Sequence, residues 1–422
     1  MNDRTAVRKE PHTTSEQILS LLDDPRALEA LYRENPAEFR RALDGASRAA
    51  PESVVLDVWR ARLEGETAES GGWRPRVARA ATIVVVFGAL IRLPALWVNP
   101  EWYYSRFAPL LVVMALCTYF WTGRRERGGL SAGLFFALAC SAYLWLLPNS
   151  TDTSDLVLMH APIVFWTLLG LVFAGHGWRT AGARIEFLRY NGELLVLASL
   201  VALGGIVFSG VTIALLQLVS DSMGQWYMDN IAVFGFVAVP VGATLLYDTV
   251  FRARTRIAAV LARVFAPLFL IMSVAYLVIA FASRQNPFLD RSFLITFNGL
   301  LLIVLGITVI SIAERDDAPK VRAGDAINFA LVSVTLLIDV IALAAIVFRL
   351  ASFGLSPNRI AVLGANLVIM AHLAWLLWTY IRTFRGRAGV ADMRLAVAHY
   401  LPVYGIWAAL VVFLLPPLFR FA

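Results

Sequence analysis

The feature that most constrains this chain is a series of apolar stretches, each about as long as a membrane is thick. A helix rises about 1.5 Å per residue, so about 20 apolar residues cross the hydrocarbon core of a bilayer. From residue 80 onward such stretches follow one another with short polar segments between them. A soluble fold of 422 residues with 59% hydrophobic and 16% charged residues could not bury this much apolar surface. We therefore predict an all-α, polytopic helical membrane protein.

We predict about eleven transmembrane helices, because eleven stretches approach the length that a bilayer requires. They are residues 80–98, 105–122, 129–147, 156–174, 194–220, 231–250, 258–283, 292–313, 326–353, 360–381 and 395–419.

The polar segments between these spans alternate in positive charge. Starting with the segment that precedes the first span, every second segment carries at least three arginines or lysines, whereas the segments between them carry at most two. Arginine and lysine accumulate on the cytoplasmic side of membrane proteins. We therefore expect the N-terminus in the cytoplasm and the C-terminus outside. The net charge of +7 is distributed as orientation signals of this kind, which argues against a nucleic-acid partner and for the lipid bilayer.

Residues 1–76 differ from the rest because they contain no apolar stretch of membrane length. Thr13 and Glu16 have the spacing of a helix-capping box, and Asp24 is a good N-cap before a proline at the first helical position. We predict a small soluble bundle of three or four helices, ending in a linker over residues 65–72. The membrane domain then covers residues 77–422.

This N-terminal domain has two interpretations, and the sequence leaves both open. It is either a docking module for a cytosolic protein partner or a solubilising cap without a partner. Its small size gives it a marginal hydrophobic core in either case.

Three ionisable residues are expected near the middle of the bilayer, where charges are rare and usually functional. They are Arg92, Asp339 and His372, and each lies close to the centre of its predicted span. With a rise of about 1.5 Å per residue from the span ends, all three fall near the midplane. Asn328 and Thr335 share a helical face with Asp339, so this span carries a polar stripe.

These residues form the candidate intramembrane polar site. An arginine–aspartate pair with a histidine beside it is a proton-responsive arrangement. The alternative is a static ion pair that fixes the register of neighbouring helices. The sequence does not show which helices are neighbours.

Two prolines fall inside predicted spans and are candidate helix breaks. Pro240 and Pro267 each remove a backbone hydrogen bond and free a carbonyl. Broken helices often line the substrate sites of transporters. Prolines are also frequent in membrane helices in general, which is the alternative interpretation.

No catalytic motif is found. The chain has no phosphate-binding loop, no His-Glu-x-x-His and no Gly-x-Ser-x-Gly, and its five histidines are not spaced to share a metal on one helix. We therefore expect neither a metal nor a cofactor, and the sequence favours a protein that is not an enzyme.

Three segments resemble a known family. They are Leu261-Ala-Arg-Val-Phe-Ala-Pro-Leu268, Pro287-Phe-Leu-Asp-Arg-Ser-Phe-Leu-Ile-Thr-Phe-Asn298 and Phe353-Gly-Leu-Ser-Pro-Asn-Arg359. Together they resemble the bacterial membrane family called domain of unknown function 4153, most clearly over residues 194–381. The resemblance implies a polytopic protein of the bacterial cytoplasmic membrane and brings no established activity.

Two functions follow from these observations as hypotheses. The first is a permease-like transporter with a midplane polar site. The second is a membrane sensor, assembly factor or scaffold that contacts a cytosolic partner through residues 1–76. Substrate and oligomeric state are not predicted.

Overall fold

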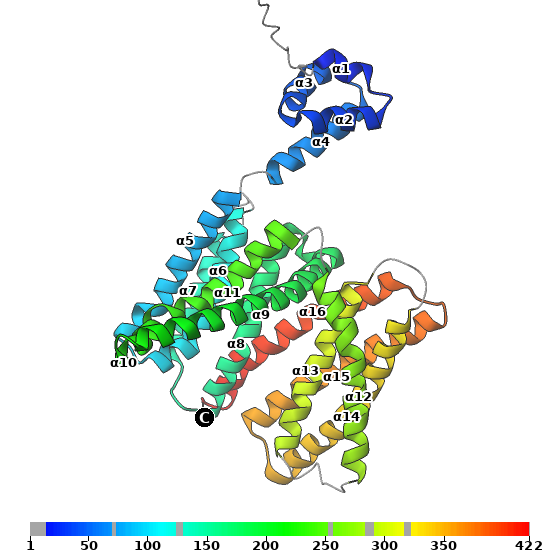
Figure 1. The fold of residues 1–422 in the computed structure, drawn as a ribbon. Helices are drawn as coiled ribbons and strands as arrows, with labels where there is room; N and C mark the ends of the chain where they lie inside the picture. The colour runs from blue at the N-terminus through cyan, green and yellow to red at the C-terminus, as the bar shows by residue number, and fades with distance from the viewer. Residues whose placement is uncertain are drawn as a thin grey trace, which may run out of the picture. The chain divides into compact units, whose positions relative to one another are not determined.

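The computed structural model describes residues 14–69, 73–123, 130–251, 256–282, 291–315 and 322–421. Every regular element within these ranges is a helix (Figure 1). The chain divides into two compact units, residues 1–78 and residues 79–422. Each unit has its own hydrophobic core, and each is described separately below.

The first unit is a bundle of four short helices. These are α1 (Ser15–Ser20), α2 (Pro25–Glu34), α3 (Pro36–Ala49) and α4 (Val54–Glu69). The side chains of Asp24 and Asn35 accept hydrogen bonds from the first turns of α2 and α3, as the Asp-Pro and Asn-Pro pairs lead one to expect. The core is built from Ile18, Leu28, Phe39, Leu43, Leu56 and Trp59.

Two details of this unit differ from the sequence-based expectation. The capping box of α1 is formed by Thr14 and Gln17, one residue further along than predicted, and Thr13 lies outside the described residues. The expected linker over residues 65–72 is helical as far as Glu69, because α4 continues through Gly65. Residues 70–72 lie outside the described residues.

The second unit contains the membrane helices. Ten helical segments of the described chain are long and apolar enough to cross a membrane. They are built on α5 (Trp73–Arg92), α6 (Pro100–Gly123), α8 (Asp152–Ala174), α9 (Ala181–Gln217), α11 (Gly235–Leu246), α12 (Ile257–Ala282), α13 (Arg291–Ala313), α14 (Ala323–Phe353), α15 (Pro357–Phe384) and α16 (Val390–Ala409).

The remaining predicted span, residues 129–147, coincides with α7 (Leu130–Leu146), an apolar helix of 17 residues. Such a helix is about 26 Å long, close to the thickness of the hydrocarbon core. The prediction of an all-α polytopic membrane protein is confirmed. Short elements complete the unit, namely α10 (Asp221–Asn230), α17 (Leu415–Leu418) and five single-turn 3₁₀ or π segments.

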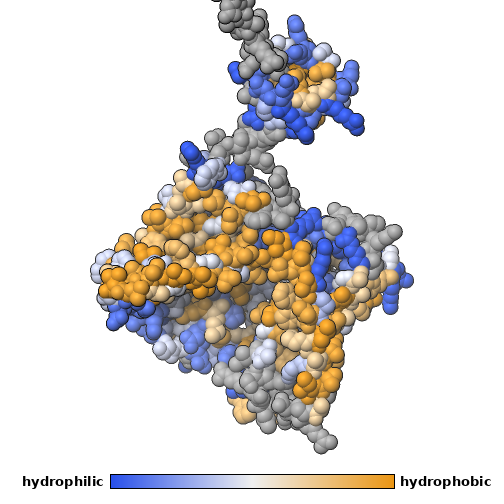
Figure 2. All heavy atoms as spheres, viewed as in Figure 1, coloured by the Kyte–Doolittle hydropathy of each residue, from blue (hydrophilic) through white to orange (hydrophobic). Residues whose placement is uncertain are grey.

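The surface of the second unit is apolar. Figure 2 shows hydrophobic residues spread over the visible face of this unit, and Ile206 and Phe208 of α9 and Ile271 of α12 are all strongly exposed. Soluble monomers rarely expose apolar patches of this extent. This surface is suited to contact lipid chains.

Inside this unit the helices share several groups of core residues, two of which involve the helices that carry the candidate site. One core joins α5, α6, α8, α9 and α11, and the other joins α12, α13, α14 and α15. Helices α9 and α16 contact members of both groups, and Figure 1 shows them between the two sets. The candidate site residues are divided between these two groups.

The expected helix breaks at Pro240 and Pro267 are wrong. Helices α11 and α12 continue through them, as α6, α8 and α16 continue through their own internal prolines. One turn after Pro240, the Thr244 hydroxyl donates to the Pro240 carbonyl (2.8 Å) and lies 2.8 Å from the Tyr190 hydroxyl, so this part of α11 is held against α9.

Candidate functional site

The polar stripe predicted for one helix lies on the buried face of α14. Asn328 is buried, and Thr335 and Asp339 are both 0% exposed. The Thr335 hydroxyl, the Asn328 carbonyl oxygen and both carboxylate oxygens of Asp339 have no hydrogen-bond partner among the residues that the structure describes. An unpaired carboxylate away from water is among the most costly groups that a fold can contain.

His372 of α15 is held from one side by aromatic residues of α16. Its Nδ1 lies 2.6 Å from the Tyr404 hydroxyl, and its ring stacks on Tyr400 with 4.3 Å between the ring centroids. The side chain is 1% exposed, and Nε2 has no partner in the described part of the chain. The ring is therefore fixed in position while one of its nitrogens stays available for a further contact.

Asp339 and His372 lie at the same depth in the bundle. Helices α14 and α15 pack together and are consecutive, so they run antiparallel. Asp339 lies about four helical turns before the end of α14 at Phe353, and His372 lies about four turns after the start of α15 at Pro357. With a rise of about 1.5 Å per residue, these positions agree within about 2 Å along the helix axis.

The polar face of α14 is directed toward α15. The Asn328 side chain hydrogen-bonds the Tyr380 hydroxyl of α15. Asp339 follows Asn328 by about three helical turns, so the two side chains point in nearly the same direction. Asp339 and His372 therefore lie on neighbouring helices at a similar height, and no hydrogen bond joins the two side chains.

The predicted pair of Arg92 with Asp339 is not formed. The Arg92 guanidinium donates to the Asn230 side-chain oxygen through Nε (3.3 Å) and Nη2 (3.1 Å). Arg92 is also the last residue of α5, which begins at Trp73 and is followed by the single turn Pro94–Leu96. The depth of Arg92 in a bilayer stays a prediction, whereas the predicted pair with Asp339 is contradicted by these contacts.

Sequence reasoning missed two asparagines, one at this level and one about 9 Å from it along α15. Asn298 lies about four helical turns before the end of α13, and Asp339 lies at a matching height, about four turns after the start of α14. Asn366 of α15 is buried. The side chains of both asparagines contain a buried polar atom without a partner among the described residues. We call the following set the central polar layer: Asn298, Thr335, Asp339, Asn366 and His372.

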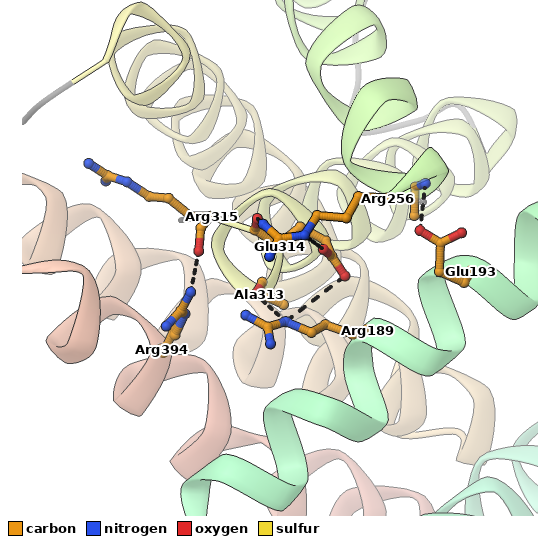
Figure 3. Close-up of polar contacts among 8 residues, drawn as sticks. Arg189, Glu193, Arg256, Ala313, Glu314, Arg315 and Arg394 are labelled. Atoms are coloured by element: carbon orange, nitrogen blue, oxygen red, sulfur yellow. Dashed lines mark hydrogen bonds and ion pairs between the residues drawn. The ribbon is translucent and has the colours of Figure 1, made fainter. Parts of the chain in front are cut away.

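A second polar cluster joins the ends of several helices (Figure 3). Glu314, which follows α13, is buried and lies between two arginines. Its carboxylate is 4.0 Å from Nε of Arg189 on α9 and 3.8 Å from Nε of Arg256, which precedes α12. Arg189 also donates to the Ala313 carbonyl at 2.7 Å. The cluster therefore connects α9 to the ends of α12 and α13.

Glu193 lies near this cluster but has a different role. Its Oε1 accepts the backbone N–H of Ala258 (3.1 Å) in the first turn of α12, and Figure 3 shows the side chain directed to that end. The close approach of α9 and α12 requires a small residue, since a Cβ at Gly192 would lie 3.1 Å from the Ala258 side chain. Glu193 is thus an N-cap supplied by another helix.

A buried ion pair lies beside these residues. Arg315 and Asp325 are both buried, and their side chains are 2.8 Å apart. Arg394 of α16 donates to the Arg315 carbonyl, so α13, α14 and α16 meet here. The sequence assigned these arginines only to membrane orientation, and no local pattern shows that Arg189 meets a carbonyl far away in the sequence.

The two sites differ in chemistry. The ionic cluster is paired, which suits a structural joint, whereas the central polar layer contains a buried carboxylate and a histidine nitrogen that no described residue contacts by a hydrogen bond. Among the described residues no three His, Cys, Asp or Glu side chains gather in a way that could hold a metal ion.

No family model, curated protein or solved structure matches the chain. The resemblance to domain of unknown function 4153 therefore stays a prediction.

Proposed function

We propose that this chain is a proton-coupled, permease-like membrane transporter, with Asp339 of the central polar layer as its charge-carrying group. The single observation that supports this most directly is the complete burial of Asp339, with no partner for either oxygen among the described residues. A charge in this environment is normally compensated by a counter-charge. A proton bound to the carboxylate is the smallest such counter-charge. When the proton leaves, the carboxylate is charged again, and the free-energy cost of burying that charge drives the next conformational step of transport.

The surroundings of Asp339 are suited to this role. The neighbouring His372 has one ring nitrogen on Tyr404 and the other without a partner in the described chain, so it is able to exchange a proton at the free position. Buried ionisable residues in membrane helices commonly mark ion and proton pathways. The alternation of basic segments further favours an N-terminal unit in the cytoplasm, and the resemblance of residues 194–381 favours a bacterial cytoplasmic membrane.

The proposal is tested by charge movement, which does not require the transported substrate to be known. Proteoliposomes adsorbed on a solid-supported membrane are exposed to a rapid pH step and, separately, to a sodium step at constant pH. We expect a transient current after the pH step in the parent protein and none in Asp339→Asn. Asp155→Asn is the matched control, because Asp155 is an exposed aspartate in the first turn of α8.

Three results would count against this function. They are no current in the parent after the pH step, a current that Asp339→Asn retains in full, and a current that responds to sodium alone. Size-exclusion profiles of all variants establish that lost current does not reflect lost folding.

The second candidate function is a membrane sensor or scaffold that binds a cytosolic partner through the first unit. The observation that favours it is the exposure of Val54 (74%) and Val58 (60%), one helical turn apart on α4 of a separately folded unit. Deletion of residues 1–72 separates the two functions. A transporter should retain the pH-dependent current, whereas a sensor or scaffold should lose recruitment of its partner.

A further inference from the structure

The polar stripe of α14 continues from Asp339 to the beginning of the helix. Asp325, Asn328, Thr335 and Asp339 are separated by three, seven and four residues and so lie on one face. All four are buried. The stripe covers about 21 Å of the helix. A helix that faces only apolar neighbours would not carry four buried polar side chains along one face.

Neighbouring helices provide polar groups at matching heights. Thr308 lies five residues before the end of α13, and Asn328 lies five residues after the start of α14. Thr308 is buried, and Tyr380 of α15 hydrogen-bonds Asn328 at this level. Polar side chains of α13, α14 and α15 therefore converge below the central polar layer. We call Thr308, Asn328 and Thr335 the polar seam.

Each residue of the polar seam has a buried oxygen without a partner in the described part of the protein, namely Thr308 Oγ1, Asn328 Oδ1 and Thr335 Oγ1. A buried polar atom without a hydrogen bond costs about 1–3 kcal/mol, and native proteins usually satisfy such atoms with water. These atoms occupy two levels, with Thr308 and Asn328 at one height and Thr335 about two helical turns further along α14, which is the pattern expected for a short file of water molecules between helices.

The end of the polar seam is closed by the ion pair between Arg315 and Asp325. Asp325 also accepts the backbone N–H of Arg322 at 2.8 Å, so its carboxylate is fixed at the start of α14. Arg315 lies two residues beyond the end of α13, and its side chain reaches Asp325 in the first turn of α14. The ion pair thus lies at the end of the seam opposite Asp339.

We propose that α13, α14 and α15 enclose a hydrated path along the polar seam, which carries protons between Asp339 and the Arg315–Asp325 end, and that this ion pair is the gate. The proposal rests on the proposed function, because Asp339 is the group that the path serves. Each water accepts one proton and releases another to the next, and the last proton forms an O–H bond on the Asp339 carboxylate. The polar seam therefore binds water molecules and conducts protons.

The path is tested by the reactivity of a cysteine placed in it. The two native cysteines, Cys117 and Cys140, are first replaced by alanine. Thr335→Cys then places a thiol in the seam, and Val340→Cys is the control on the same helix, since Val340 is 56% exposed on the apolar surface. Silver ion, which is small and requires water to reach a thiol, is added to membrane vesicles, and the remaining thiol is counted with a fluorescent maleimide after solubilisation.

We expect silver to modify Thr335→Cys at least about tenfold faster than Val340→Cys, which corresponds to about 1.4 kcal/mol. Opening the gate with Arg315→Gln should raise the rate at Thr335→Cys by a further factor of about ten. If Arg315→Gln does not fold, Asp325→Glu replaces it, because the longer side chain keeps the charge but not the 2.8 Å geometry.

Equal rates at the two cysteines would overturn the path, and an unchanged rate in the gate variants would overturn the gate. The outcome is separable from that of the proposed function. A seam that silver enters, in a protein without a pH-driven current, would retain the hydrated path and exclude proton-coupled transport.

Discussion

Replacing Asp339 by leucine should make this protein more stable. The carboxylate is fully buried, and neither oxygen has a partner among the described residues. Burying such a polar group costs about 0.5–2 kcal/mol where hydration compensates it in part and about 1–3 kcal/mol where nothing does. Leucine branches at the same carbon as aspartate and has no polar atom. We therefore expect Asp339→Leu to raise the free energy of unfolding by about 1–3 kcal/mol while it abolishes the pH-driven current.

Glu193 is the matched control, because it is also a buried carboxylate within a membrane helix. In contrast to Asp339, it accepts a backbone N–H of α12. Glu193→Leu removes this cap and leaves the amide of Ala258 unpaired. The expected loss of stability is about 1–2 kcal/mol, opposite in sign to the effect at Asp339.

The assay is reversible unfolding of the purified protein in mixed micelles with increasing sodium dodecyl sulfate, followed by circular dichroism. Arg92→Ala is added to this series, alone and together with Asp339→Asn. Because Arg92 contacts Asn230 and not Asp339, the two effects should add within about 0.5 kcal/mol. A loss of stability above about 1 kcal/mol in Asp339→Leu, or strong coupling between Arg92 and Asp339, would refute this reasoning.

Two further predictions concern packing and pH. A Cβ at Gly405 of α16 would lie 2.6 Å from Thr167 Oγ1 of α8, so Gly405→Ala should lower the free energy of unfolding in the same assay by about 1–3 kcal/mol; Gly205→Ala, whose Cβ would meet no described atom within 4 Å, should not lower it. In the first unit, hydrogen bonds from Arg62 and then Arg33 lower the pKa of Glu29 from its ordinary value of 4.5, so their stabilisation is present above pH 4.5 and is lost as the pH falls below it. Hydrogen exchange of α2 and α4, corrected for intrinsic rates, should therefore rise at acid pH, and an equal rise in Glu29→Gln would contradict the assignment.

The membrane class of the fold could be predicted from the sequence because bilayer thickness fixes the length of an apolar helix. The ends of the helices could not. Helix α5 begins at Trp73, since its early arginines can extend along the helix toward the headgroups and do not interrupt it. Arg92, which falls in the middle of the predicted span, is the last residue of α5 in the structure.

The candidate site was predictable in part, because helix geometry fixes which residues of one helix share a face. Helical periodicity alone showed that Asn328, Thr335 and Asp339 share a face. The partners across the bundle depend on which helices pack together, and one sequence does not contain that information. Asn298 was visible only as the last residue of a segment shared with the resembled family, and nothing in the local pattern marked it as part of a polar layer.

The expected breaks at Pro240 and Pro267 failed for a physical reason. A proline inside a helix removes one hydrogen bond, but a packed membrane helix keeps its path when neighbouring groups support the backbone. One turn after Pro240, the Thr244 hydroxyl lies 2.8 Å from the hydroxyl of Tyr190 on α9, and this contact holds α11 in its path. Such support comes from tertiary contacts, which the proline itself does not reveal.

The length of α9 has a consequence for how this protein responds to its membrane. With 37 residues the helix is about 55 Å long, and its apolar part after Glu193 is about 36 Å long, whereas the hydrocarbon core is about 30 Å thick. A helix this long adapts to a thinner bilayer by tilting. Because α9 holds α12 through Glu193 and α13 through Arg189, a change in tilt pulls directly on the bundle that contains Asp339. The acyl-chain length of the lipids should therefore affect the packing of the helices around Asp339. We expect vesicles of different bilayer thickness to give different pH-driven currents.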